Sequence, residues 1–414
     1  MRRIRKGKII ACLDIGSSNL ICVIASLFSD GEVRVLGHSI KESKGISGGA
    51  ISDMRLAQKS IISVISEAER ISNVNIDKIL VSISASIIKS DRIEEKIKIA
   101  TGAVKSSDIS NLANKVRGNF RKNNREMIHL IPIQYRIDDS MPVQNPRLMS
   151  GGNLYAKFHA VSTSKTNILN IENCLRSCQI SVNSYIIDPY ASYLSAKSSI
   201  EGGAGNLIIN IGSDVTSFCV VIDNKLIFAD GFVMAGSHIT KDISTIVGVS
   251  TDYAEKIKTL NSTLILSQSA NKEIVKYRIS NQDESKILKL TKGDLKEIIK
   301  SRLEEIFEHV KKSLKENNIP EFSYSEIAIT GGSSNIIGAD SLCSEIFEKP
   351  AKISSPIEVP DLSNYEEINT AEYSSILGMI LFVKNLMQKE RIKDGFEHTE
   401  MSWIKKLLLK ILDV

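Results

Sequence analysis

The sequence has few aromatic residues and little excess charge for its length. Phe, Trp and Tyr make up 5% of the 414 residues, so the chain offers few platforms on which single-stranded bases could stack. A formal net charge of +5 is also small for a chain of this size. We therefore predict that nucleic acid is not a partner.

Cysteines and histidines are scarce and scattered. None of the six cysteines forms a C-x-x-C pair, and the six histidines show no ligand spacing. We therefore expect neither a disulfide framework nor a structural zinc site. Cys174 and Cys178 stand one helical turn apart and are interpreted as small buried side chains in a reducing cytosol.

Long apolar runs are also missing. The longest candidate, "ILGMILFV" at 376–383, is far shorter than the ~20 residues of a membrane span. The basic N-terminus "MRRIRKGK" precedes an apolar stretch, "IIACL", that is too short for a signal peptide. The sequence thus predicts a cytosolic protein, unless a segment lies on a membrane rather than through it, and its length favours two or more domains.

The chain contains the same type of turn twice. "IIACLDIGSSNLICV" at 9–23 and "LIINIGSDVTSF" at 207–218 each place a glycine and small polar residues between two apolar strands. A further strand follows each turn, and then helical spacing at 52–72 and 237–247. The repeat predicts two similarly built α/β domains that face each other across a ligand cleft.

Segments of different character interrupt both halves. The second interruption ends in a long amphipathic helix, for which Thr291 and Asp294 are the expected N-terminal cap. We predict a first domain at 1–84 and 163–203 with an insert at 85–162, a second domain at 204–247 and 320–388 with an insert at 248–319, a charged linker at 389–401, and an amphipathic helix at 402–414.

The repeated turns have the composition of phosphate-binding turns. Glycine and hydroxyl residues let backbone N–H groups converge on an anion without a Cβ in the way. A third candidate, "AITGGSSNIIG" at 328–338, places Gly331 and Gly332 at the end of a strand, before a helix expected from about Asn335. Each turn alone is more often an ordinary hairpin, but the three in this order predict a polyphosphate cleft.

These three segments resemble the two phosphate motifs and the adenosine motif of the actin, Hsp70 and sugar-kinase superfamily. The resemblance implies an actin-like, ribonuclease H-like α/β fold: duplicated domains around a nucleotide cleft. The short segment "KESKGISGGA" between the third strand and the first helix leaves no room for an early insert. This absence, together with the later insert, resembles the FtsA family of bacterial cell division proteins, in which the later insert is called 1C and the insert of the second half is of 2B type. "GISGGAISD", "HLIPIQYRIDD", "IDPYASYLSA" and "MAGSHITKDIS" extend the resemblance over nearly the whole chain.

The resemblance implies ATP and Mg²⁺ as ligands, with Asp14 holding the metal through water. Asn210 replaces the second aspartate of the superfamily, and Ser237 stands where another is common, so we expect slow or absent hydrolysis. Partial compensation by Asp214 is the alternative. The residues expected to bind nucleotide are Asp14, Gly16, Ser17, Ser18, Asn19, Asn210, Gly212, Ser213, Asp214, Val215, Thr216, Gly236, Ser237, Glu255, Lys258, Gly331, Gly332 and Ser333. For Glu255 and Lys258, a solvated helix face is the alternative.

The C-terminal segment "SWIKKLLLKILDV" has the pattern of an amphipathic helix, with its apolar residues on one half of the circumference and lysines beside them. We predict that it lies on an anionic lipid surface, weakly as one copy and tightly in an array. A last helix docked on the protein's own core is the alternative. The expected membrane-contacting residues are Trp403, Ile404, Lys405, Lys406, Leu407, Leu408, Lys410, Ile411 and Leu412.

The family resemblance implies a role in cell division. Members polymerise on the inner face of the cell membrane at the division site, bind the C-terminal peptide of the tubulin-like protein FtsZ and help to recruit later division proteins. Arg302 and Glu305 resemble the peptide-binding positions, and an ordinary solvated charge pair is the alternative. The rival family is the actin-like ATP-binding component of type IV pilus assembly, against which the amphipathic C-terminus argues. Asn210 argues against an enzyme such as a sugar kinase.

Overall fold

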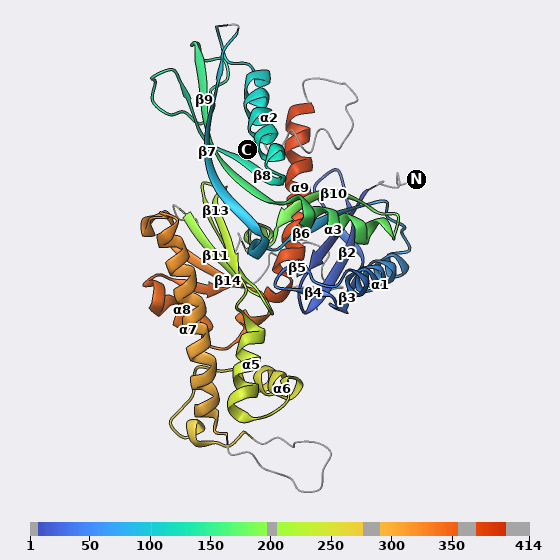
Figure 1. Ribbon diagram of the computed structural model, residues 1–414, viewed down its shortest axis with the longest axis vertical. Helices are drawn as coiled ribbons and strands as arrows, with labels where there is room; N and C mark the ends of the chain where they lie inside the picture. Colours follow the sequence, from blue (N-terminus) through green and yellow to red (C-terminus); the bar gives the residue numbers. More distant parts are fainter. Residues whose placement is uncertain (1–6, 101, 197–204, 276–289, 355–369, 395–414) are drawn as a thin grey trace.

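The computed structural model describes residues 7–100, 102–196, 205–275, 290–354 and 370–394 (Figure 1). The predicted amphipathic helix at 402–414, with all its expected membrane contacts, lies outside the described residues, as does the last part of the predicted linker. Within the described residues, no helix is both long enough and apolar enough to cross a membrane.

The first half is built on a five-stranded sheet with the strand order β10-β6-β1-β2-β3. The meander β1-β2-β3 is antiparallel, whereas β6 and β10 run parallel to β1. The strand bounds are β1 (Lys8–Ile15), β2 (Asn19–Leu27), β3 (Val33–Glu42), β6 (Lys78–Ile83) and β10 (Ser181–Ile187), and a small hairpin of β4 (Ile46–Ser47) and β5 (Ala50–Ile51) follows β3.

The second half repeats this arrangement in the order β13-β12-β11-β14-β15. Again a three-strand antiparallel meander comes first, and two parallel strands extend it. The bounds are β11 (Gly205–Ile211), β12 (Thr216–Ile222), β13 (Lys225–Phe232), β14 (Glu326–Thr330) and β15 (Ala351–Ile353). The predicted duplication of an α/β unit is therefore confirmed.

Helices cover both faces of the first sheet. On one face, α1 (Met54–Ser72) and α3 (Lys165–Arg176) bury side chains such as Ile61, Val64 and Leu175. On the other face, α9 (Ser374–Asp394) packs Ile376 and Ile380 against the strands and lies beside α4 (Asp188–Ala196). The C-terminal helix of the second half thus returns to the first half (Figure 1). It also extends into the predicted linker, which was expected to begin at residue 389.

The insert of the first half is a separate small layer at one end of the molecule (Figure 1). Its antiparallel sheet has the order β7-β9-β8, and α2 packs on one face with a core of its own. The bounds are β7 (Ile88–Lys98), α2 (Ser106–Lys122), β8 (Arg125–Ile137) and β9 (Asn153–Ser164), preceded by the 3-10 turn η1 (Ala85–Ile87).

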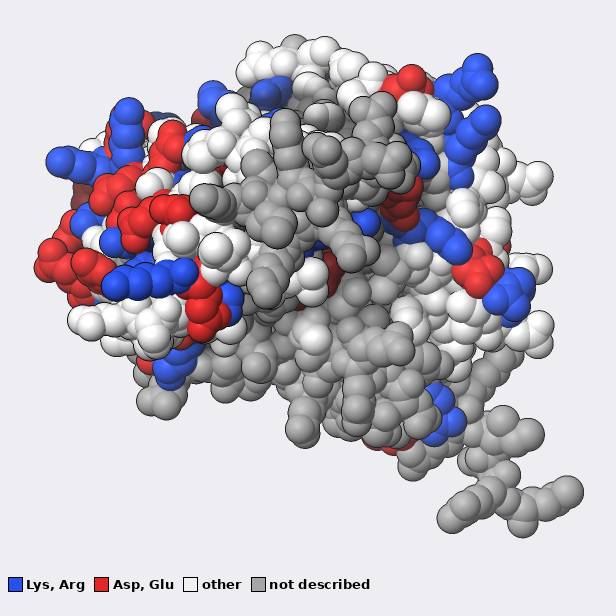
Figure 2. All heavy atoms as spheres, turned by 90° about the horizontal axis from the view of Figure 1, so that it is seen from below, with Lys and Arg blue, Asp and Glu red and all other residues white. Residues whose placement is uncertain are grey.

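The second half carries its helices at the opposite end. The long helix α7 (Lys292–Glu316) starts at the predicted cap, where Thr291 and Asp294 exchange hydrogen bonds, and its predicted apolar stripe is buried except for the partly buried Ile298. Seen from this end, basic and acidic side chains are interspersed (Figure 2). The remaining elements are α5 (Gly236–Val247), α6 (Thr251–Asn261), η2 (Ala270–Lys272), η3 (Glu321–Ser323), η4 (Gly332–Asn335), α8 (Ala339–Phe347) and η7 (Ala371–Tyr373).

The helix expected from about Asn335 starts later, so that prediction is wrong. Residues Gly332–Asn335 form a 3-10 turn, and Gly338 then adopts a φ of +90°, which an α-helix cannot contain. The helix α8 therefore begins only at Ala339.

Candidate functional site

A cavity of about 540 Å³ lies between the two halves, and all three glycine-rich turns reach it. The first turn follows β1, the second follows β11 and the third follows β14. Because β1 and β11 occupy equivalent places in the two sheets, the two repeated turns face the same cavity from opposite sides. The sequence repeat therefore produces one composite site.

The two repeated turns have the same backbone geometry. In each, four residues separate the last paired residues, Ile15 with Leu20 and Ile211 with Thr216. A hydrogen bond closes each turn, from Gly16 N to Asn19 O (3.2 Å) and from Gly212 N to Val215 O (3.0 Å). A Cβ on Gly16 would lie 2.6 Å from Asn19 O, so this turn requires glycine. The small residues thus keep the backbone accessible to an anion.

Most of the residues predicted to bind nucleotide line this cavity. They are Asp14, Gly16, Ser17, Ser18, Asn19, Asn210, Gly212, Ser213, Asp214, Val215, Glu255, Lys258, Gly331, Gly332 and Ser333. The same cavity is lined by residues that sequence reasoning missed, among them Ser82, Asp188, Glu372 and Ser375.

Thr216, Gly236 and Ser237 are not among the cavity-lining residues, although they were predicted to bind nucleotide. The Thr216 hydroxyl donates to Met234 O (2.6 Å), and the backbone N–H groups of Gly236 and Ser237 donate to Gly212 O (3.2 Å) and Ser213 O (2.7 Å). Gly236 and Ser237 therefore bind the backbone of the second turn, on the side away from the cavity. The geometry shows no direct approach of these three residues to a ligand in the cavity.

Three polar residues meet at one edge of the first sheet. The strands β1, β6 and β10 run parallel, so their carboxyl ends lie together, and they bring Asp14, Ser82 and Asp188 to that edge. Ser82 Oγ donates to Asp14 Oδ1 (2.5 Å) and accepts from Ile15 N (3.0 Å). Ser375, at the start of α9, donates to the same Asp14 oxygen over 3.4 Å.

Burial changes the protonation of both carboxyl groups. It raises the pKa of Asp14, although the Ser82 and Ser375 hydroxyls partly oppose this effect. Burial also raises the pKa of Asp188 to about 7, and the nearby charge of Asp14 adds to the increase. The hydrogen bonds from Ser217 Oγ (2.6 Å) and Ala85 N (3.0 Å) favour the charged form of Asp188 but do not offset its burial. Asp188 therefore titrates near neutral pH.

We expect Asp188→Asn to stabilise the protein at alkaline pH. The folded-state pKa of about 7 lies above the ordinary value of 3.8, so ionising Asp188 costs stability as the pH rises through this window. Asparagine keeps the oxygen that accepts from Ala85 and removes the charge. Chemical denaturation at about pH 8 should show a gain of about 2 kcal/mol that disappears near pH 4. An equal gain at both pH values would contradict the assignment to ionisation.

The third turn packs directly on the end of β11. Gly331 has a φ of +87°, and a Cβ there would lie 2.3 Å from Asn210 Oδ1 and 2.5 Å from Ile211 O. Asn210 Nδ2 donates to Ser192 Oγ over 3.4 Å. Asn210 is thus held between the third turn and α4, and it brings no charge to the cavity.

The remaining charged residues of the cavity come from several elements. Asp214 Oδ2 accepts from Gly48 N (3.3 Å), so the second turn touches the β4–β5 hairpin of the first half. Lys258 has a side chain only 11% exposed and pairs with Glu255 (2.7 Å) and Thr240 Oγ1 (2.8 Å). The alternative of a solvated helix face does not describe Lys258, which lies against the N-terminus of α5.

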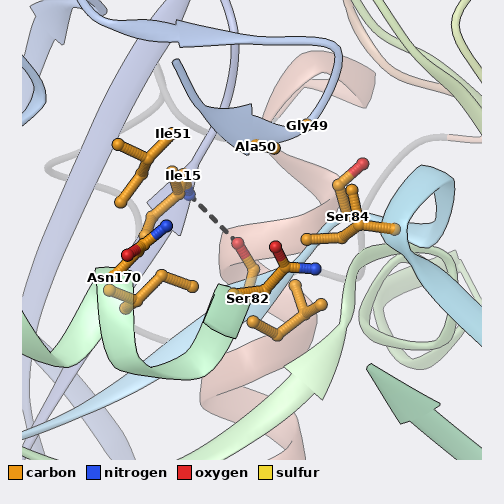
Figure 3. A pocket seen from close by; sticks show the side chains of 11 residues that line it. Ile15, Gly49, Ala50, Ile51, Ser82, Ser84 and Asn170 are labelled. Atoms are coloured by element: carbon orange, nitrogen blue, oxygen red, sulfur yellow. Dashed lines mark hydrogen bonds between the residues drawn. The ribbon is translucent and has the colours of Figure 1, made fainter. Parts of the chain in front are cut away.

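A smaller pocket of about 20 Å³ adjoins the cleft below the β4–β5 hairpin (Figure 3). Ile15, Ser82 and Asn170 line it, and Figure 3 marks the bond from Ile15 N to Ser82 Oγ. This space holds about one water molecule, so it is too small for a nucleotide.

The chemistry of the cleft fits a metal-bound polyphosphate. Among the described lining residues, the acids outnumber the single cation, Lys258, so a polyphosphate requires a neutralising cation. The raised pKa values of Asp14 and Asp188 indicate two buried carboxyl groups that such a cation would relieve. Among the described residues, no cluster of three or more His, Cys, Asp or Glu could hold a metal alone, so water and phosphate oxygens would complete its coordination.

The predicted partner residues lie at a second, open groove between α5 and α7. Asp242, Ile246, Ile298, Arg302 and Glu305 are among the residues that line its roughly 370 Å³. Arg302 binds Asp242 in a bidentate manner, with Nε–Oδ2 at 2.7 Å and Nη2–Oδ1 at 2.9 Å, and also pairs with Glu305 at 2.5 Å. Because the Arg302 side chain is only 23% exposed, it joins two helices, unlike a solvated surface pair.

Two protein-family models match the chain. "Cell division protein FtsA" matches residues 207–378, and "SHS2 domain inserted in FTSA" matches residues 85–162. The chain is 26% identical to cell division protein FtsA of Pseudomonas aeruginosa over 382 residues, which cover 92% of this chain and 91% of that protein. It is 27% identical to cell division protein FtsA of Buchnera aphidicola subsp. Baizongia pistaciae over 423 residues, 98% of this chain and all of that protein.

Solved structures share the fold at lower identity. The PilM-PilN type IV pilus biogenesis complex contains a chain that is 15% identical, with a TM-score of 0.65 over 90% of this chain and 98% of that one. MreB5 of Spiroplasma citri bound to ADP is 15% identical, with a TM-score of 0.57 over 93% of this chain and 98% of that one. These neighbours establish an actin-like fold.

Proposed function

The chain belongs to the FtsA family of cell division proteins, and on that premise we propose that it is an ATP-binding adaptor that attaches FtsZ filaments to the cytoplasmic membrane. It would assemble into filaments on the inner face of that membrane at the division site and help to recruit later division proteins. Three parts of the molecule support this proposal: the cleft, the α5–α7 groove and the C-terminal segment.

The cleft supports binding of ATP with Mg²⁺. It combines accessible backbone turns from both halves with buried carboxyl groups, and the related fold of MreB5 was solved with ADP. A bound Mg²⁺ would supply positive charge beside the phosphates. Asp14 would face its water shell, and Lys258 with Glu255 would border the nucleoside end. The neutral Asn210 favours slow or absent hydrolysis, because it provides no second negative charge that would help Asp14 to hold the cation.

The α5–α7 groove is the observation that carries the partner assignment. Ile246 is 65% exposed beside Ile298, and Arg302 and Glu305 stand at its border. An exposed apolar side chain between charged residues is the arrangement expected of a peptide site, because the apolar side chain supplies affinity and the charges supply orientation. We infer that the C-terminal peptide of FtsZ docks here.

The C-terminal segment would provide the membrane contact. Its lysines each add about 1 kcal/mol near an anionic surface, and the apolar side chains add more, but ordering the helix opposes both. One copy would therefore bind reversibly, whereas a filament of copies would bind tightly through high effective concentration. Membrane attachment and self-association would then reinforce each other.

Fluorescence anisotropy of a labelled FtsZ C-terminal peptide, titrated with the full chain, tests this proposal. We expect saturable binding that Ile246→Glu weakens at least about tenfold, since a charge replaces an exposed apolar contact. Arg302→Glu should weaken it too, but it also places a third carboxylate beside Asp242 and Glu305. Ile246→Glu is the sharper variant because Ile246 lies outside that ion-pair network.

Lys312→Glu is the control that introduces the same charge outside the groove, because Lys312 lies on α7, is absent from the groove lining and has a 71% exposed side chain. It should leave peptide affinity unchanged, and both variants should bind ATP as the parent does. Equal affinity of Ile246→Glu and Lys312→Glu would refute the assigned groove. Absence of peptide binding at high micromolar concentrations would favour the rival role in type IV pilus assembly, which the fold likeness to PilM-PilN alone does not support over FtsA.

A further inference from the structure

The insert at 85–162 carries the positive charge of the whole chain. It contains thirteen Lys and Arg residues against seven Asp and Glu, a net charge of +6, whereas the full chain has +5. At the opposite end of the molecule, acidic and basic side chains are mixed (Figure 2). Positive charge is thus concentrated on a single small domain.

Strand register places much of this charge on one face of the insert's sheet. Side chains alternate along β7, so Arg92, Lys96 and Lys98 share a face, and cross-strand pairing adds Lys157 on β9 and Arg136 on β8. These five residues are the basic face. The opposite face is covered by α2 and holds Ile93, Ile97 and Phe158 in the insert's core.

An aromatic ring organises the centre of the basic face. Tyr155 lies between Lys96 and Arg136 in register, with the Arg136 guanidinium 4.1 Å and the Lys96 ammonium 5.9 Å from the ring centroid. Cation–π contacts hold both side chains over the sheet. Glu94 and Asp139, each 3.8 Å from Arg136, do not balance the face, since Lys96 and Lys98 remain exposed beside them.

The second half of the molecule borders the basic face. At its base, on the same face of β9, His159 Nδ1 bonds to Leu226 O (2.9 Å) of β13, so the second half forms a wall there. At the β8 side, Val143 of the 138–152 connection pairs with Tyr135, and Gln144 contacts Lys225 at the start of β13. A single extended chain fits beside this border more readily than a flat bilayer does.

We propose that the basic face of the insert binds an acidic, extended peptide segment of a partner protein. The charge of the face selects glutamate and aspartate, and the Tyr155 ring offers an apolar contact to the segment between them. Neither the nucleotide cleft nor the α5–α7 groove contributes to this surface, so it would act as an independent docking site.

The test uses the full chain and a fluorescein-labelled peptide of alternating Glu and Ser, about eight residues long, which is enough to cross the face. We expect binding that Lys96→Glu weakens at least about tenfold and that added salt weakens further. The matched control is Lys89→Glu, because Lys89 is on the same strand, is 63% exposed, and points to the opposite face. Lys89→Glu should change the affinity less than about twofold.

Each outcome decides the proposal. Selective loss in Lys96→Glu, with both variants unfolding at the parent's midpoint, supports the assigned face. Equal affinity of the two variants, or no binding at low salt, overturns it. Anionic phosphatidylglycerol vesicles are the competing probe. If Lys96→Glu lowers vesicle binding but leaves peptide binding unchanged, the surface is a lipid contact and the peptide proposal fails.

Discussion

Replacing Gly378 by alanine is expected to destabilise the protein by about 3 kcal/mol, because it separates two helices that cross at this residue. A Cβ on Gly378 would lie 1.7 Å from Ala191 O and 2.4 Å from Ala191 C. These are backbone atoms of α4, so no side-chain rotation can relieve the overlap. The helix α9 must therefore shift, and Leu377 and Ile380 lose part of their packing on the first sheet.

Gly118→Ala makes the same chemical change at a site where the change in stability is expected to have the opposite sign. Gly118 lies within α2, and a Cβ there meets no atom within 4 Å. Alanine should stabilise this helix by about 0.5–1 kcal/mol, since glycine is a poor helix former. Urea denaturation of both variants, with the slope compared as well as the midpoint, separates the two effects. A Gly378→Ala variant as stable as the parent would contradict the tight α4–α9 crossing.

The α9 crossing also has a functional consequence. At the start of this helix, Ser375 donates a hydrogen bond to Asp14 in the nucleotide cleft. At its other end, the helix leads into the C-terminal segment of the chain. If the C-terminal segment contacts a membrane, α9 is the connection between that contact and the nucleotide cleft. Gly378→Ala, which displaces α9, should therefore weaken both nucleotide binding in the cleft and its coupling to membrane binding. Gly118→Ala should affect neither.

The duplicated α/β unit could be predicted from sequence because it depends on local order. The turns at Gly16 and Gly212 are short, are flanked by apolar strands and close with the same hydrogen bond. That the two turns face one cavity could also be predicted, because two similarly built domains are expected to face each other across a cleft. The cap at Thr291 was predictable for the same reason, since all its hydrogen bonds lie within four residues.

The acidic edge of the cleft could not be predicted in the same way. Ser82 and Asp188 reach Asp14 only because three strands far apart in sequence become parallel neighbours. One signal was present: an aspartate directly after a buried strand and at the start of a helix, in "IDPYASY". Thr216 and Ser237 lie outside the cavity lining, because residues next to a motif in sequence can lie behind it in space.

Two buried histidines join the insert to both halves of the molecule. His159 connects Ser90 Oγ (2.6 Å) with Leu226 O of the second half, and His129 accepts a hydrogen bond from Ile187 N (3.2 Å) of the first. Burial lowers the pKa of His129 to about 3 and of His159 to about 4. Both are therefore neutral in the folded protein throughout the range in which a free imidazole gains a proton.

Acid is consequently expected to destabilise the junction of the insert. Below about pH 6.5 the unfolded chain binds two protons that the folded chain cannot, so stability falls as the pH falls. Asp188 acts in the opposite direction between about pH 4 and 7, because its pKa is raised and the folded state takes up its proton first. The Asp188→Asn background removes this opposing contribution. Asp14, whose pKa burial raises, and His238, whose pKa burial lowers, stay the same in every variant, so differences between variants report the two junction histidines.

In that background, lowering the pH from about 7.5 to about 5 should reduce the free energy of unfolding by about 4 kcal/mol, roughly half from each histidine. His129→Gln keeps an acceptor for Ile187 N, and His159→Asn keeps a donor for Leu226 O, so each should remove about 2 kcal/mol of the acid loss. Hydrogen exchange should show the insert losing protection first. If both junction variants keep the full acid loss, carboxyl groups elsewhere cause it, and the histidines do not hold the insert in place.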